Sequence, residues 1–154
     1  MKLPRSVLAQ FRVRTERSKH SAYFNVFVFA DRAAMHIFDA AQQRKLGREP
    51  EPYFEAQVSS WKTVSVRPDG TERVHRLMGT IVFHADCLGA GIVSHEMTHA
   101  ALRYAERIDL KVDFQDDGHD AEREERLCWI QGWLVCQFWE AAYEAPRLRR
   151  ILKA

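Results

Sequence analysis

The chain has few cysteines and no long hydrophobic run, and each absence excludes a class of protein. Its 154 residues include three cysteines, Cys87, Cys128 and Cys136, and none of them forms a CxxC pair. This number and spacing support neither a disulfide framework nor a cysteine zinc finger, and they suit a reducing compartment. No run of about 18 apolar residues occurs, so we expect no transmembrane helix.

A strong excess of charge is also absent. The net charge is +2, from 23 basic and 21 acidic residues that are interspersed along the chain. This near balance gives no electrostatic reason to expect nucleic acid or a membrane surface as the main partner. The first 14 residues carry arginines where a signal peptide would have its apolar segment, so we expect a cytoplasmic protein.

The chain does contain enough apolar material for a substantial core. Hydrophobic residues make up 46% of the sequence and aromatic residues 11%. This composition is typical of soluble globular proteins, and the length favours one domain over two. We therefore expect a single domain that spans residues 1–154.

The first third of the chain is expected to form two strands and a helix. Residues 6–13 alternate loosely between apolar and polar, and residues 22–30 are aromatic and β-branched, so both segments are predicted strands. Asp31 is a plausible N-cap for a helix that follows and that should end near Gly47.

The rest of the chain is expected to contain a β-hairpin and two longer helices. Residues 54–66 and 73–83 flank the turn sequence at residues 68–70, Pro-Asp-Gly, which favours a hairpin. Residues 91–105 form the first predicted helix. Residues 121–143, which begin with several acidic side chains, form the second, because carboxylates stabilise the start of a helix.

The first of these helices carries an HExxH motif, His95-Glu96-Met97-Thr98-His99. Residues four apart on a helix share a face, so His95 and His99 can bind one metal ion with Glu96 beside them. A carboxylate next to a metal-bound water can accept a proton from that water, and the resulting hydroxide can attack a carbonyl. The alternative is a buried helix whose histidines have only hydrogen-bond partners. We prefer a Zn²⁺ site, because burying these three groups among apolar residues is costly without one.

Catalytic zinc usually has three protein ligands, so one ligand remains to be found. Glu125, Glu124 and His119 are the candidates downstream of the motif. The residues three and seven positions after Glu125 are Cys128 and Gly132, and small side chains would let that helix face approach the motif helix. We therefore prefer Glu125 to Glu124. His119 ranks third because a loop residue fixes ligand geometry less firmly.

The motif, together with Glu125-Arg126-Leu127-Cys128, resembles the active site of the zincin metallopeptidases whose third ligand is a glutamate. The resemblance implies an α+β, zincin-like fold with a mostly antiparallel sheet packed against the motif helix and the C-terminal helix. It implies a peptidase, similar to small intracellular or phage-type enzymes, that acts on proteins or peptides. Glu96 would be the general base. The strand before the motif helix, residues 79–84, would align an extended substrate.

A second hypothesis is a zinc-binding interaction or regulatory module without catalysis. It is favoured by the small size of the chain and by the lack of the aspartate that often follows the third ligand by four positions. His84, at the end of the predicted strand, is expected to be partly exposed. The sequence leaves the substrate and the oligomeric state open.

Overall fold

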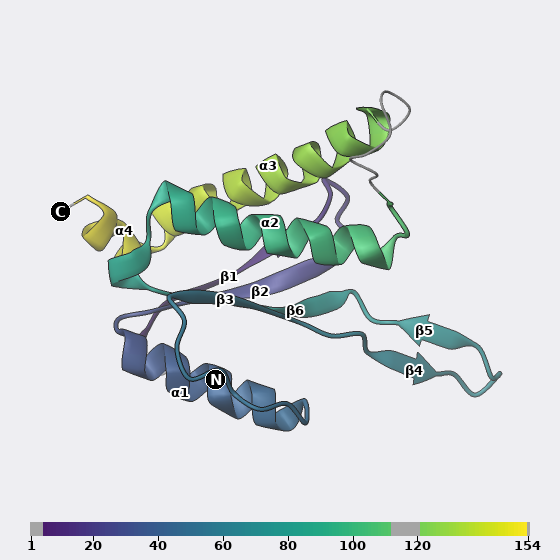
Figure 1. The fold of residues 1–154 in the computed structure, drawn as a ribbon, viewed down its shortest axis with the longest axis horizontal. Coiled ribbons are helices and arrows are strands. Elements are labelled where there is room, and N and C mark those ends of the chain that lie inside the picture. Colours follow the sequence, from purple (N-terminus) through teal and green to yellow (C-terminus); the bar gives the residue numbers. More distant parts are fainter. Residues whose placement is uncertain (1–4, 112–120, 154) are drawn as a thin grey trace.

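Four strands form one mixed sheet that has helices on both faces (Figure 1). The computed structural model describes residues 5–111 and 121–153. The sheet contains β1 (Val7–Arg14), β2 (Tyr23–Phe29), β6 (Leu77–His84) and β3 (Ala56–Ser60), in that order. β2 and β6 are parallel, whereas the β1–β2 and β3–β6 pairs are antiparallel. The predicted α+β class is confirmed.

The helices divide unequally between the two faces of the sheet. α1 (Arg32–Lys45) covers one face. α2 (Ala90–Arg107), α3 (Ala121–Glu144) and the short α4 (Pro146–Leu152) lie on the other (Figure 1). The 3₁₀ turn η1 (Ala85–Cys87) connects β6 to α2. Asp31 caps α1 as predicted, because its side chain accepts a hydrogen bond of 2.8 Å from the Ala34 N–H.

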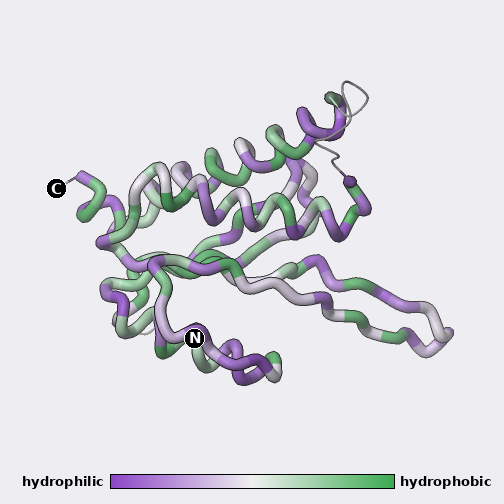
Figure 2. The backbone as a smooth tube through the Cα atoms, in the orientation of Figure 1, coloured by the Kyte–Doolittle hydropathy of each residue, from purple (hydrophilic) through white to green (hydrophobic). Residues whose placement is uncertain are grey.

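Alternation along the strands divides the buried side chains into two cores. Ile81 and Phe83 of β6 belong to the larger core, which lies under α2 and α3. Val82, between them, packs with Met35 of α1 on the opposite face. Figure 2 shows hydrophobic residues concentrated in the centre of the sheet, while hydrophobic and hydrophilic residues alternate along α2 and α3. Within the described ranges, no helix has the length and apolar character needed to cross a membrane.

The predicted hairpin is confirmed and extends well beyond the sheet. After β3 and before β6, the chain forms β4 (Val64–Val66) and β5 (Glu72–Val74), which pair antiparallel as a two-stranded ribbon (Figure 1). At its turn, Asp69 accepts hydrogen bonds from the backbone and hydroxyl of Thr71, and Gly70 adopts a φ of 80°. The ribbon projects past the C-terminal half of α2.

Candidate active site

The two motif histidines lie on the exposed face of α2 and point at each other. The Nε2 atoms of His95 and His99 are 3.1 Å apart, and the ring planes meet at 79°. In this arrangement one imidazole donates a hydrogen bond to the other. The helical spacing that the sequence predicted is therefore present, although the face that carries both histidines is solvent-exposed.

This geometry fits a shared metal ion. Two nitrogens bound to one tetrahedral zinc at roughly 2.0 to 2.1 Å would be about 3.3 Å apart. The separation in the structure, 3.1 Å, differs from that value by only a few tenths of an ångström. A metal ion bound by both rings would replace the hydrogen bond between them, and each ring would turn so that its Nε2 faces the ion.

Glu96 lies beside the histidines in a different environment. It is buried, with 7% of its surface exposed, and it lines a pocket of about 460 Å³ between α2 and the start of β3. His95 lines the same pocket, together with Glu55, Ala56 and Ile92. Burial raises the pKa of the Glu96 carboxyl above its ordinary value, while the nearby His95 lowers it. A carboxylate and an imidazole of the motif thus face one cavity.

The contacts between α2 and α3 show which face of α3 lies near the motif. Gln131 donates a hydrogen bond of 2.9 Å to the Ser94 hydroxyl, and Leu127 lines a pocket of about 330 Å³ with His99. Glu124 precedes these two residues by seven and three positions, so it lies on the same helical stripe. Glu125 lies about 100° around the helix from it.

The preference for Glu125 required the face of α3 with Cys128 and Gly132 to approach α2 closely. The packing of α3 does not support this close approach. Cys128 is exposed, and a Cβ added at Gly132 would meet no atom within 4 Å. Among the described residues, neither Glu124 nor Glu125 joins the histidines in a compact group of ligand atoms. Both glutamates are exposed. His119 lies outside the described residues.

A second group of candidate ligands lies at the end of β6. Glu55, His84 and Cys87 form, within the described ranges, the one set whose three ligand atoms all lie within 4.8 Å of one another. His84 is 3% exposed, so the expectation of a partly exposed histidine is wrong. Its Nε2 lies 3.0 Å from a Glu55 carboxylate oxygen. The hairpin register explains the pairing, because Ala56 is opposite Phe83 and the residues next to them are brought together.

The members of this second group already have partners within the protein. Glu55 accepts hydrogen bonds from Tyr53 and Arg32, and Tyr53, His84 and Arg32 hold the pKa of its carboxyl at about 2. The Cys87 thiol donates to the backbone oxygens of Glu55 and His84, both at 3.1 Å. Burial raises the pKa of this thiol and favours its protonated form. Metal binding here would have to displace an ion pair and a thiol proton.

The edge of the sheet next to α2 is β3 and not β6. The prediction that residues 79–84 align an extended substrate by main-chain pairing is wrong, because β6 is paired with β2 on one side and with β3 on the other. The parallel pairing of β2 with β6 puts the second hairpin arm inside the sheet and leaves the first arm at its edge. Ala56, at the start of β3, lines the pocket of His95 and Glu96.

Comparisons of the chain with protein-family models, with curated proteins and with solved structures found no match.

Proposed function

We propose that the protein is a zinc-dependent peptidase whose active site is the motif face of α2 and the pocket beside it. The observation that carries the proposal is the convergence of the His95 and His99 Nε2 atoms, 3.1 Å apart, next to a buried Glu96. A bound zinc ion would supply Lewis acidity and lower the pKa of a water molecule toward 7. His95, His99 and a carboxylate from the start of α3 would hold it.

Glu96 is the general base in this proposal. Its carboxylate lies in the pocket, where it can accept a proton from the attacking water and later deliver that proton to the leaving amine. The neighbouring Ile92 and Ala56 add apolar surface to the lining of this pocket. Apolar surroundings strengthen the interaction of the carboxylate with the reacting groups.

The edge strand β3 provides a place for an extended substrate. Among the described residues β3 pairs with β6 on one side and with no strand on the other, so the polar backbone groups of that other side can bind a peptide as an added strand. Such a peptide would lie between β3 and α2, with one of its peptide bonds beside His95 and Glu96.

For the third ligand we favour Glu124. It shares a helical stripe with Leu127, which lies near His99, and with Gln131, which bonds to Ser94 of α2. A glutamate has a flexible side chain, and an exposed one can rotate toward the histidines without disturbing the core.

The test of the mechanism is Glu96→Gln, which removes the base and keeps the shape of the side chain. Incubated with zinc and a mixture of unfolded proteins, the variant should cleave at least about 100-fold more slowly than the wild type, because general bases contribute 10²- to 10⁴-fold. It should retain bound zinc. The matched control is Glu140→Gln on the exposed face of α3, away from both pockets. Undiminished cleavage by Glu96→Gln would sink the mechanism.

A second candidate function is a metal-binding module without catalysis. The observation that favours it is the compact group of Glu55, His84 and Cys87, which is more nearly assembled than the ligand set of the motif. Loading the protein with Co²⁺ in place of zinc distinguishes the motif site from the group of Glu55, His84 and Cys87. Binding at the motif uses nitrogen and oxygen ligands, whereas binding at the second group would produce an intense thiolate-to-cobalt charge-transfer band that Cys87→Ser removes.

A further inference from the structure

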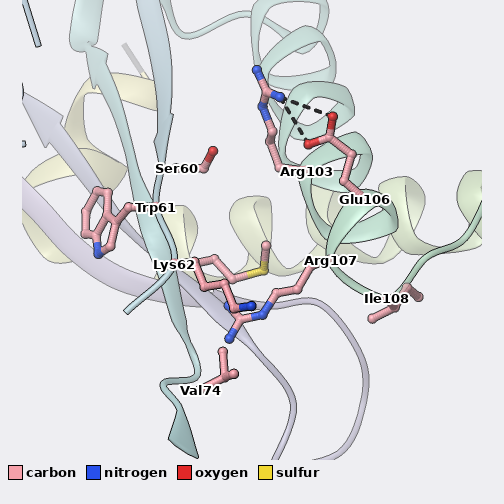
Figure 3. Close-up of a pocket in the computed structure, with 9 residues that line it drawn as sticks. Ser60, Trp61, Lys62, Val74, Arg103, Glu106, Arg107 and Ile108 are labelled. Carbon is pink, nitrogen blue, oxygen red and sulfur yellow. Dashed lines mark hydrogen bonds and ion pairs between the residues drawn. The ribbon is translucent and has the colours of Figure 1, made fainter. Parts of the chain in front are cut away.

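A pocket larger than that of His95 and Glu96 lies at the other end of the groove between β3 and α2. Its volume is about 610 Å³, which is within the range of ligand-binding pockets. The strand side contributes Trp61, Lys62 and Val74, and α2 contributes Arg103, Glu106 and Arg107 (Figure 3).

The charges around this pocket are not balanced. Glu106, the one acidic residue among the described residues that line it, accepts hydrogen bonds of 3.1 and 3.4 Å from Arg103. Figure 3 shows these two side chains turned toward each other, which leaves Lys62 and Arg107 without that carboxylate.

Lys62 and Arg107 extend toward each other from opposite walls of the pocket (Figure 3). Arg107 donates to the backbone oxygen of His75 through Nη2, but its Nη1 is buried and has no hydrogen-bond partner within the described part of the chain. Lys62 forms no ion pair with any described residue. Buried donors usually have acceptors, and two neighbouring cations favour an anion between them. An anionic group that entered the pocket could pair with both cations.

The groove sets the distance between this pocket and the active site. The active-site pocket is lined by Ala56 and Glu96, and the pocket with Lys62 and Arg107 is lined by Trp61 and Arg103. Along β3 the two are five residues apart, or about 17 Å at roughly 3.3 Å per residue. Along α2 they are seven residues apart, or about 10 Å at roughly 1.5 Å per residue. An extended peptide that occupies both pockets would span three to five residues.

We propose that this second pocket is a substrate subsite that binds the side chain of an aspartate or glutamate three to five residues from the cleaved bond. The inference rests on the proposed peptidase function. β3 runs from the active-site pocket toward the subsite. A substrate that pairs antiparallel with β3, the commoner geometry, therefore has its acidic residue on the N-terminal side of the cleaved bond.

The test is digestion of a proteome-derived peptide library, with cleavage sites mapped by mass spectrometry. The wild type should show at least about a fivefold enrichment of acidic residues at one position three to five residues before the cleaved bond, because a charge-assisted hydrogen bond to Lys62 or Arg107 favours those peptides. Lys62→Gln should abolish the enrichment, and Lys62→Glu should replace it with basic residues. Lys45→Glu, the same charge change on exposed α1, should leave it intact.

Cleavage without an acidic preference, or a preference that survives both Lys62 variants, overturns the subsite and leaves the peptidase proposal standing. If the wild type cleaves nothing, the peptidase proposal fails, and binding then decides the subsite. Peptides from the same library captured by Glu96→Gln should be enriched in acidic residues, and peptides captured by Glu96→Gln/Lys62→Gln should not. Equal capture by the two proteins overturns the subsite independently of catalysis.

Discussion

Glu96 and the motif histidines share one turn of α2 but occupy different environments. Glu96 is 7% exposed in a pocket, whereas His95 and His99 are exposed to solvent. The histidines are therefore accessible to a metal ion, while the carboxylate is partly shielded from water. Residues one apart on a helix differ by about 100° around its axis, so adjacent positions can provide both environments. The proposed third ligand lies on a different helix, at the start of α3.

Alanine substitutions distinguish the two glutamates. Glu124→Ala should weaken zinc binding by at least about 100-fold, because even partners outside the coordination shell are worth 10- to 100-fold. Glu125→Ala should bind zinc as the wild type does, because it lies off the stripe of Leu127 and Gln131 that meets α2. The measurement is competition with a chelator of known zinc affinity. The reverse pattern would identify Glu125, and normal binding by both variants would leave His119 as the remaining candidate from the sequence.

Most strands and helices were predictable within a few residues, but the short helix α4 and the arrangement of the strands were not. The Pro-Asp-Gly turn predicted the hairpin, alternation predicted β1, and aromatic and β-branched residues predicted β2. No local pattern shows which hairpin arm pairs with β2. That choice depends on long-range contacts of Phe83 and Ile81 with the core under α2 and α3. The edge position of β3, and the pairing of Glu55 with His84, follow from it.

Gly79 in β6 is essential to the way the two hairpin arms pack. A Cβ at this position would lie 1.9 Å from the backbone oxygen of Ser59 on β3. Gly79→Ala must therefore displace backbone, and we expect it to lower the free energy of unfolding by at least about 2 kcal/mol, or roughly 4 to 8 °C in melting temperature. The control is Gly132→Ala in α3, where a Cβ meets nothing within 4 Å. It should raise stability by about 0.5 to 1 kcal/mol.

A Gly79→Ala protein that melts within 1 or 2 °C (about 0.5 kcal/mol) of the wild type would contradict the close approach of β3 and β6. Thermal unfolding followed by circular dichroism is sufficient for both variants. Displacement of Ser59 by the added Cβ should also move Ser60, which follows it in β3 and lines the subsite pocket.

In the whole molecule, the proposed metal site joins elements that are otherwise held by few polar contacts. α2 and α3 pack through apolar residues, and the Gln131–Ser94 contact is the hydrogen-bonded link between them that the described residues show. The motif was predictable because its ligands lie on one helix. The sequence also placed a candidate third ligand on α3, but it did not show whether Glu124 or Glu125 faces α2, since that face of α3 is set by buried Ile130, Leu134 and Phe138.

Zinc should therefore stabilise the entire fold. A ligand that binds only the folded state at 100 times its dissociation constant adds about 2.7 kcal/mol. For a chain of this size, the melting temperature should rise by about 5 to 10 °C with zinc, compared with protein treated with EDTA. Differential scanning calorimetry at matched ionic strength measures the change.

Two variants locate the origin of this stabilisation. His95→Ala removes a motif ligand from an exposed surface, so the metal-free protein should melt normally and the response to zinc should disappear. His84→Ala disrupts the buried pair with Glu55 and should lower the melting temperature of the metal-free protein, while the added stabilisation by zinc stays. If His84→Ala loses the stabilisation by zinc and His95→Ala keeps it, the metal lies among Glu55, His84 and Cys87. The HExxH motif of α2 would then have no metal-dependent catalytic role.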